Sequence, residues 1–183
     1  NAFGGGAAWV FAGGTLNLFH STVTNNNSIN PASGGALINQ GTLNIFNSAI
    51  VNNSALGSTV QNSGDCGAIC NEGLLNIANS TISGNRAGGN GGGLFLNFGS
   101  VVNLTHVTIT GNTADADNNG TGDGGGILMQ GGTLLFKNSI IAGNFDTPNN
   151  AGPNATTPDI TTKTSDPTFS FVGALVSGGY NVI

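Results

Sequence analysis

Charged side chains are scarce in this chain of 183 residues, of which only 6% are charged. Eight acids and three bases give a formal net charge of -5, and the bases are Arg86, Lys137 and Lys163. Three scattered bases cannot neutralise a phosphate backbone, so the composition argues against nucleic-acid binding. Long hydrophobic runs are also missing: no stretch of about 18 apolar residues occurs, and we therefore expect no transmembrane helix.

Cysteine, tryptophan and tyrosine are rare as well, at two, one and one residues. The chain has neither an initiator methionine nor a visible signal peptide, so we expect a mature or excised piece of a longer protein. Glycine and asparagine are abundant instead, with 32 and 28 residues. A hydrophobic content of 38% combined with few charges does not fit intrinsic disorder.

One pattern recurs five times, in segments that begin at Ala7, Gly34, Cys66, Gly91 and Gly125. Residues at matching positions of successive repeats form a column. The best-defined column recurs at intervals of 27, 32, 27 and 32 residues and contains Leu16, Leu43, Leu75, Val102 and Leu134. A column of asparagines closes each repeat with the same steps: Asn26, Asn53, Asn85, Asn112 and Asn144. Because the two columns keep one register, we expect extra residues only between a closing asparagine and the next repeat.

Each repeat contains three short stretches in which apolar and polar residues alternate, such as residues 36–38, 42–45 and 48–51 of the second repeat. Glycine, asparagine and serine separate the stretches, and no helical period survives. Three strands in a repeat of about 30 residues are typical of one coil of a three-faced parallel β-helix. The sequence therefore predicts an all-β fold, a parallel β-helix (β-solenoid) with about five to six coils of 27–32 residues.

Residues 1–144 are predicted to form five coils of this β-helix. Residues 145–183 break the repeat, because Pro148, Pro153, Pro158 and Pro167 interrupt it. We expect this part to form an irregular final coil or a wrapping and capping segment. A β-helix this short has two open ends, which normally need polar caps or further chain.

Three apolar columns are expected to point inward and to build the core. They are Leu16/Leu43/Leu75/Val102/Leu134, Leu18/Ile45/Ile77/Leu104/Phe136 and Val23/Ile50/Ile82/Ile109/Ile141. The closing asparagines are expected to form an internal ladder, in which each side-chain amide bonds to the next one.

One further apolar column is expected to point outward, and it consists of Val10, Leu37, Ile69, Phe95 and Leu128. Five stacked apolar side chains would form an exposed patch of the size that marks interaction surfaces. This column is therefore the candidate lateral interface, and Phe95→Lys is expected to abolish association while leaving the β-structure intact. Two alternatives stay open: residues 145–183 cover the column, or the assumed register is wrong.

The insertion between the fourth and fifth repeats is similar in spacing to a calcium loop of the EF-hand type. Its candidate ligands are Asp115, Asp117, Asn119, Thr121 and Asp123. Three carboxylates so close together repel one another unless a divalent cation gathers them. Gly126 stands where such a loop has its bidentate glutamate, so a solvated, glycine-rich insertion is the alternative.

Cys66 and Cys70 allow two interpretations. If both lie on one strand, their Cα atoms are too far apart for a disulfide and Cys70 is a buried free thiol. If Cys66 lies in the turn before Gly67, a disulfide can form in an oxidising compartment. His20 and His106 share one turn column with three asparagines, and we expect them to replace asparagines in a ladder rather than to bind a metal.

Catalytic residues are not expected. An enzyme on this fold would most naturally be a pectate lyase or a polygalacturonase, which needs a carboxylate cluster with an arginine base, or paired carboxylates. The chain has one arginine, and Glu72 has no acidic partner in its column. Hydroxyl pairs at residues 22 and 24, 81 and 83, and 108 and 110 suggest an ice-binding face as a less favoured function, although two of the five repeats lack the pair.

The repeat resembles the right-handed parallel β-helix repeat of bacterial secreted and surface proteins. Its glycine-rich opening is similar to that of autotransported polymorphic membrane proteins. Residues 138–144, 158–160 and 178–183 are similar to the end of β-helix domains in choice-of-anchor surface proteins. The resemblance covers nearly the whole chain, implies a right-handed winding and an extracellular location, and names no activity.

We therefore expect an extracellular structural or adhesive β-solenoid without catalytic activity, either a self-associating fibre subunit or a cell-surface module. Its expected partners are other copies, end to end or laterally, or adjoining domains of a longer chain. The alternative is a glycan-binding or degenerate polysaccharide-lyase-like module of a larger secreted protein. Calcium is the only cofactor that the sequence suggests.

Overall fold

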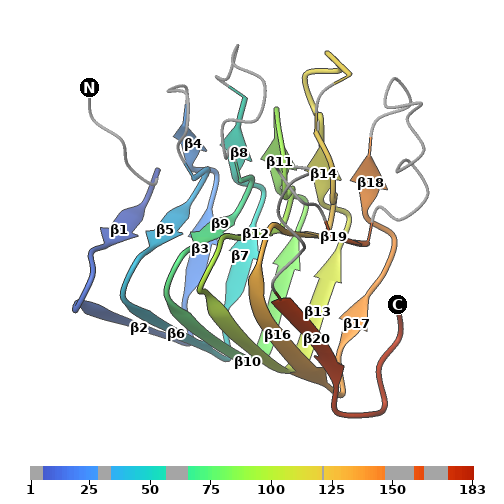
Figure 1. Cartoon of the computed structure of the whole chain (residues 1–183). Helices are drawn as coiled ribbons and strands as arrows, with labels where there is room; N and C mark the ends of the chain where they lie inside the picture. The colour runs from blue at the N-terminus through green and yellow to red at the C-terminus, as the bar shows by residue number, and fades with distance from the viewer. Residues whose placement is uncertain (1–5, 29–33, 57–65, 121, 147–158, 163–172) are drawn as a thin grey trace.

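The computed structural model describes residues 6–28, 34–56, 66–120, 122–146, 159–162 and 173–183 (Figure 1). The strands in these residues form three parallel sheets, and no helix occurs among them. The predicted all-β class and the predicted parallel pairing are confirmed.

Sheet 1 contains β1 (Ala8–Val10), β5 (Leu37–Asn39), β9 (Ile69–Asn71), β12 (Leu94–Leu96), β15 (Ile127–Met129) and β19 (Ile160–Thr162). Sheet 2 contains β2 (Thr15–Phe19), β6 (Thr42–Phe46), β10 (Leu74–Ser83), β13 (Val101–Thr110), β16 (Gly132–Lys137) and β20 (Gly173–Ser177). Three short strands lengthen sheet 2 along β10 and β13: β3 (Thr22–Thr24), β7 (Ala49–Val51) and β17 (Ile140–Ile141). Sheet 3 contains β4 (Asn27–Ser28), β8 (Ser54–Ala55), β11 (Arg86–Ala87), β14 (Thr113–Ala114) and β18 (Phe145–Asp146).

Each of the five repeats contributes strands to sheet 1, then to sheet 2, then to sheet 3. Strands from successive repeats therefore lie side by side, from the blue β1 at one end of the molecule to the red β20 at the other (Figure 1). The first, second and fifth repeats cross sheet 2 in two strands, whereas β10 and β13 cross it unbroken.

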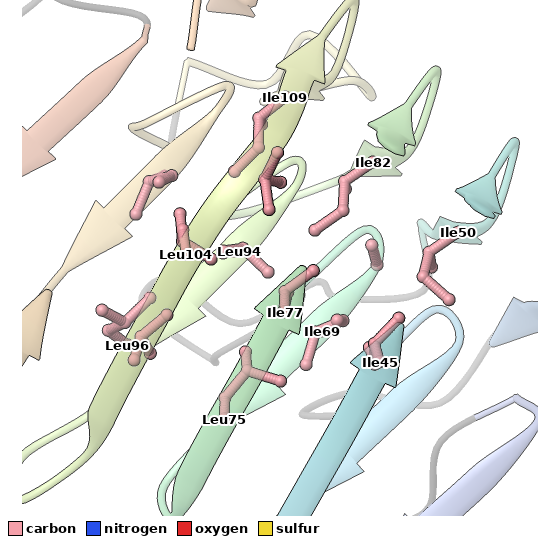
Figure 2. Packing of buried hydrophobic residues seen from close by; sticks show 14 of the residues in the cluster. Ile45, Ile50, Ile69, Leu75, Ile77, Ile82, Leu94, Leu96, Leu104 and Ile109 are labelled. Atoms are coloured by element: carbon pink, nitrogen blue, oxygen red, sulfur yellow. The ribbon is translucent and has the colours of Figure 1, made fainter. Parts of the chain in front are cut away.

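The three predicted core columns pair in register, and from the second repeat to the fifth their side chains are buried. Leu43 pairs with Leu75 and Leu75 with Val102, and all three side chains are 0% exposed. Side chains from sheets 1 and 2 meet between the strands, as Figure 2 shows for Ile69, Leu94, Ile77 and Leu104. Burial of each such side chain contributes about 1.5–3 kcal/mol, so the stacked columns supply most of the packing energy.

The bend within sheet 2 requires residues with positive φ. His20, Asn47, Asn79, His106 and Asn138 have φ between 47° and 55° in this bend. Asparagine and histidine adopt this left-handed conformation more readily than most other residues. The positive φ at this position therefore explains why the column contains only histidine and asparagine.

The predicted outward column is wrong, because the register of sheet 1 differs from the assumed one. Val10 pairs with Asn39, and Leu37 pairs with Ala8 and Ile69. Leu37 and Ile69 belong to the core, so their side chains do not share a face with Phe95 and Leu128. The column on the outer face of sheet 1 is instead Trp9, Ile38, Cys70, Phe95 and Leu128.

Turn length is the reason for this error. The face changes between the third and fourth repeats, because the assumed column places Ile69 opposite Phe95 whereas Ile69 pairs with Leu94. Two residues, 72–73, connect the third repeat's strands in sheets 1 and 2, and four residues, 97–100, connect those of the fourth repeat. Insertions therefore occur inside the repeats as well as between them. A shift of one residue along a strand moves a side chain to the opposite face.

The outer column is also buried rather than exposed. Phe95 is 6% exposed and Leu128 is 0% exposed. The turn before each strand folds back over this face: a Cβ placed on Gly91 would lie 2.9 Å from Cβ of Phe95, and one on Gly34 would lie 3.2 Å from Cγ1 of Ile38. The column is a second small core and not a lateral interface.

The described parts of residues 145–183 continue the sheets. Strand β19 pairs with β15, β20 pairs with β16, and a bridge joins Ile140 to Val182. The prolines that interrupt the repeat, and with them most of the predicted wrapping segment, lie outside the described residues.

Candidate functional site: the polar ladders and the strand edges

A ladder of buried asparagines runs across the repeats between sheets 2 and 3. In each step from Asn26 to Asn144, the backbone N–H and Nδ2 of one asparagine both donate to Oδ1 of the next, at 3.0–3.1 Å and 2.9 Å. Asn53, Asn85 and Asn112 are 0% exposed. Because buried polar groups are costly unless they are bonded, the ladder holds neighbouring repeats in one register. The predicted internal ladder is confirmed.

Asp159 closes this ladder at its C-terminal end. Its Oδ1 accepts the N–H of Asn144 at 2.9 Å and the Nδ2 of Asn144 at 2.8 Å. Asp159 directly precedes β19, so its carboxylate reaches the ladder from a different backbone column than the asparagines do. The sequence repeat gave no signal for this role, because Asp159 does not belong to the closing column.

A second row, made of serines, lies at the bend of sheet 2. The N–H of Ser21 donates to Oγ of Ser48 at 3.0 Å, and the N–H of Ser48 donates to Oγ of Ser80 at 3.1 Å. The row resumes at Ser139, whose Oγ accepts the N–H of Val107 at 3.1 Å. It ends where the N–H of Ser139 donates to Oδ1 of Asn181 at 3.0 Å.

A third row, of asparagines on the outer face of sheet 2, runs in the opposite direction. Nδ2 of Asn44 donates to Oδ1 of Asn17, and the same contact joins Asn76 to Asn44 and Asn103 to Asn76, at 2.7–2.8 Å. The next residue in this column is Leu135, so the row stops there. A shallow hollow of about 300 Å³ lies at this point, and Lys137 is the charged residue in its lining.

The N-terminal edge of the described structure, formed by β1, β2, β3 and β4, has different properties from the middle. These strands are the outermost members of their sheets. Leu16, Leu18 and Val23 are only half-buried there, whereas the matching residues of the next repeat are fully buried. The edge therefore exposes backbone groups and part of the core.

An aromatic pair lies beside a polar row at the corner between sheets 1 and 2. The rings of Trp9 and Phe11 stack with centroids 4.6 Å apart, and Phe11 is 61% exposed. Trp9 Nε1 donates to Gln40 Oε1 at 3.2 Å, and Gln40 Nε2 donates to Glu72 Oε2 at 2.9 Å. Glu72 thus pairs with an amide and not with a second carboxyl.

Cys66 and Cys70 form a disulfide, with their Cα atoms 5.5 Å apart. Cys66 lies opposite Gly34 in the turn before β9, and Cys70 occupies the outer column, so Cys70 is not a free thiol. The bridge closes a turn that the other repeats close without one.

Replacing the bridge with the residues of the second repeat, Cys66→Gly with Cys70→Ile, should preserve the fold and remove its sensitivity to reductant. Reduction of the unmodified chain should lower the free energy of unfolding by about 2 kcal/mol, because the closed loop is short. Denaturant titration with and without reductant measures both effects. A reduced chain that is as stable as the oxidised one would contradict this prediction.

The carboxylates of the predicted calcium loop do not gather. Oδ1 of the buried Asp115 accepts the N–H groups of Asn119 and Gly120, at 2.9 and 3.2 Å. Oδ2 of Asp117 accepts Nδ2 of Asn119 at 2.7 Å. Thr121 lies outside the described residues, and within the described part no three His, Cys, Asp or Glu side chains are close enough to hold a metal ion. The calcium hypothesis gains no support here.

The two histidines and the hydroxyl pairs lie on the outer surface. Nε2 of His106 is 3.0 Å from Nδ2 of Asn138, as expected for a histidine that replaces an asparagine in a hydrogen-bonded row. The positive φ of His20 explains why a histidine can occupy that position. Thr81 and Thr108 are neighbours on the outer face of sheet 2, but Ala49 and Ile140 stand next to them in the same column.

No helix in the described residues is long and apolar enough to cross a membrane. Comparisons with protein-family models, with curated proteins and with solved structures each found no match. The fold and its ladders are therefore the basis for any functional conclusion.

Proposed function

We propose that this chain is a right-handed parallel β-helix of five to six coils that serves as an extracellular structural or adhesive module without catalytic activity. Sheets 1 and 2 each have a path of six strands and sheet 3 has five, which supports this number of coils. Connections between parallel strands of one sheet are right-handed in about 98% of cases, which supports the handedness.

The observation that carries the structural role is the use of polar side chains. The buried asparagines and serines bond from repeat to repeat, and Glu72 bonds to the amides of Gln40 and Asn97. These side chains hold the repeats together, whereas glycoside hydrolysis would require paired carboxyls. The disulfide supports an extracellular location, because disulfides persist in oxidising compartments.

A panel of acidic and neutral polysaccharides tests the proposal. The oxidised chain should release no reducing ends beyond those released by a heat-denatured control, and it should remain folded in the absence of any cofactor. Turnover of any polysaccharide in the panel would overturn the non-catalytic role.

Glycan binding is a second candidate function, and the corner with Trp9 and Phe11 favours it. An exposed aromatic face beside amide and carboxylate groups offers both stacking and directional hydrogen bonds. If this corner binds glycans, Phe11→Ala should weaken retention on an insoluble polysaccharide about tenfold, while Phe98→Ala, at an exposed phenylalanine in the equivalent turn of another repeat, should not. Equal retention of the two variants would exclude the corner as a glycan site.

A further inference from the structure

The outer face of sheet 2 changes its chemistry where the third row ends. Asn103 on β13 pairs with Leu135 on β16, and Leu135 pairs with Val176 on β20, so apolar side chains replace the asparagines. Leu135 is 38% exposed and Val176 is 45% exposed. The hollow of about 300 Å³ lies over these residues, and its lining also contains Thr105, Lys137 and Gly178. A hollow of this volume is at the lower end of the range for small-molecule sites.

The polar groups of the hollow lie on strands that are paired on both sides. Strand β13 pairs with β10 and β16, and β16 pairs with β13 and β20, which lie side by side in Figure 1. Gly178 leaves the space beside Lys137 open, because a Cβ on Gly178 would lie only 2.8 Å from Cβ of Lys137. The N–H of Gly178 donates to the carbonyl of Phe136 at 2.7 Å, which fixes the backbone at this point. The polar groups therefore do not depend on an unpaired strand edge.

Asn103 presents a hydrogen-bond acceptor to the hollow. Its Nδ2 donates to Oδ1 of Asn76 at 2.8 Å, whereas its own Oδ1 accepts no hydrogen bond from any residue that the structure describes. All amides of this row point the same way and polarise one another, so Oδ1 of Asn103 is the acceptor end of the row. Leu135, the next residue in the column, has no donor. A ligand with a hydroxyl group would complete the row.

Lys137 places a positive charge at the other end of the hollow, and no acidic residue belongs to the lining. Thr105 pairs with Lys137 as Asn103 pairs with Leu135, so Lys137 is offset from Asn103 by one strand and two residues. This offset separates the two Cα atoms by about 7–8 Å. The hollow therefore combines a cation, an apolar floor and an acceptor, in that order.

We propose that this hollow binds a small monocarboxylate whose apolar body carries a hydroxyl group at the opposite end. The carboxylate pairs with Lys137, the apolar body covers Leu135 and Val176, and the hydroxyl group donates to Oδ1 of Asn103. Charge complementarity favours this ligand over a neutral one, and the net charge of -5 disfavours anions with several charges. The site goes beyond the proposed structural role and is independent of the corner with Trp9 and Phe11.

Three matched compounds test the inference on the oxidised full chain. The probe is 4-hydroxyphenylacetate; phenylacetate lacks its hydroxyl group, and 4-hydroxyphenylacetamide lacks its charge. Titrations followed by NMR should give shifts centred on Thr105, Lys137 and Gly178. Each of the two incomplete compounds should bind at least about threefold more weakly than the probe. No binding of the probe, equal binding of the three compounds, or shifts centred elsewhere would overturn the inference.

Variants assign the two ends of the site, and circular dichroism verifies that each is folded. Lys137→Met should remove the preference for the probe over its amide, and Asn103→Leu should remove the preference for the probe over phenylacetate. Arg86→Met is the matched control, because it removes a positive charge from sheet 3 and should leave the affinity unchanged. Equal losses for Lys137→Met and Arg86→Met would contradict the site. None of these results affects the non-catalytic proposal, which only turnover of a polysaccharide overturns.

Discussion

Replacing Asn85 with alanine is expected to lower the free energy of unfolding by about 3 kcal/mol, because it breaks the inner ladder in its fully buried middle. Oδ1 of Asn85 accepts both the N–H and the Nδ2 of Asn53, and its own Nδ2 donates to Asn112 and to the carbonyl of Ile50. Alanine leaves the buried N–H of Asn53 without an acceptor. Urea titration of the oxidised chain, followed by circular dichroism, measures the loss.

Two further variants test whether the loss of stability is specific to the inner ladder or follows from the replacement of any asparagine. Asn85→Asp keeps the acceptor but removes the donor and places a carboxylate against two acceptor oxygens, so it should destabilise at least as much as alanine. Asn76→Ala, in the outer row of the same repeat, should cost less than about 1 kcal/mol because this amide is partly solvated. Equal losses for Asn76→Ala and Asn85→Ala would show that the inner ladder has no special role.

Replacing Phe95 with lysine is expected to prevent folding. Phe95 is 6% exposed and packs in the second core with Ile38, Cys70 and Leu128. A lysine there would bury an unpaired charge and remove aromatic packing, and truncation to alanine alone should cost about 3–5 kcal/mol. Thermal unfolding of Phe95→Ala and the soluble yield of Phe95→Lys measure these effects.

Phe98 is the matched control, because it lies three residues further along the same repeat and is 50% exposed. Phe98→Ala should change stability by no more than about 0.5 kcal/mol. If Phe95→Lys instead folded normally and lost only self-association, the outer column would be an interface and the observed register of sheet 1 would be wrong.

Sequence periodicity predicted most of the fold because the repeat is visible in residues that must be buried. The leucine and isoleucine columns of sheet 2 and the closing asparagines keep a constant distance from one another, so their pairing followed directly. Sheet 1 could not be aligned in the same way. The turn between sheets 1 and 2 varies in length, and a single sequence gives no means of placing that insertion.

The candidate site was harder to predict, since its decisive residues lie outside the repeat. Asp159 and Asn181 act as acceptors for Asn144 and Ser139 only because the chain after the fifth repeat brings them to the ends of the rows. The acidic loop after the fourth repeat has the spacing of a calcium site, yet the backbone N–H groups of the loop bind its first carboxylate. Residue spacing does not show which donors a carboxylate meets in the folded chain.

Residue-resolved amide hydrogen exchange of the full chain tests most directly whether the ladder holds the repeats together. The N–H groups of Asn53, Asn85 and Asn112, which donate to buried Oδ1 atoms, should be among the slowest to exchange. The N–H of Asn144, bonded to Asp159, should stay protected, while β2 and β3, which pair on one side only among the described strands, should exchange faster than β10 and β13. Rapid exchange at Asn85 and Asn112, or exchange in β2 and β3 as slow as in β10 and β13, would contradict the structure.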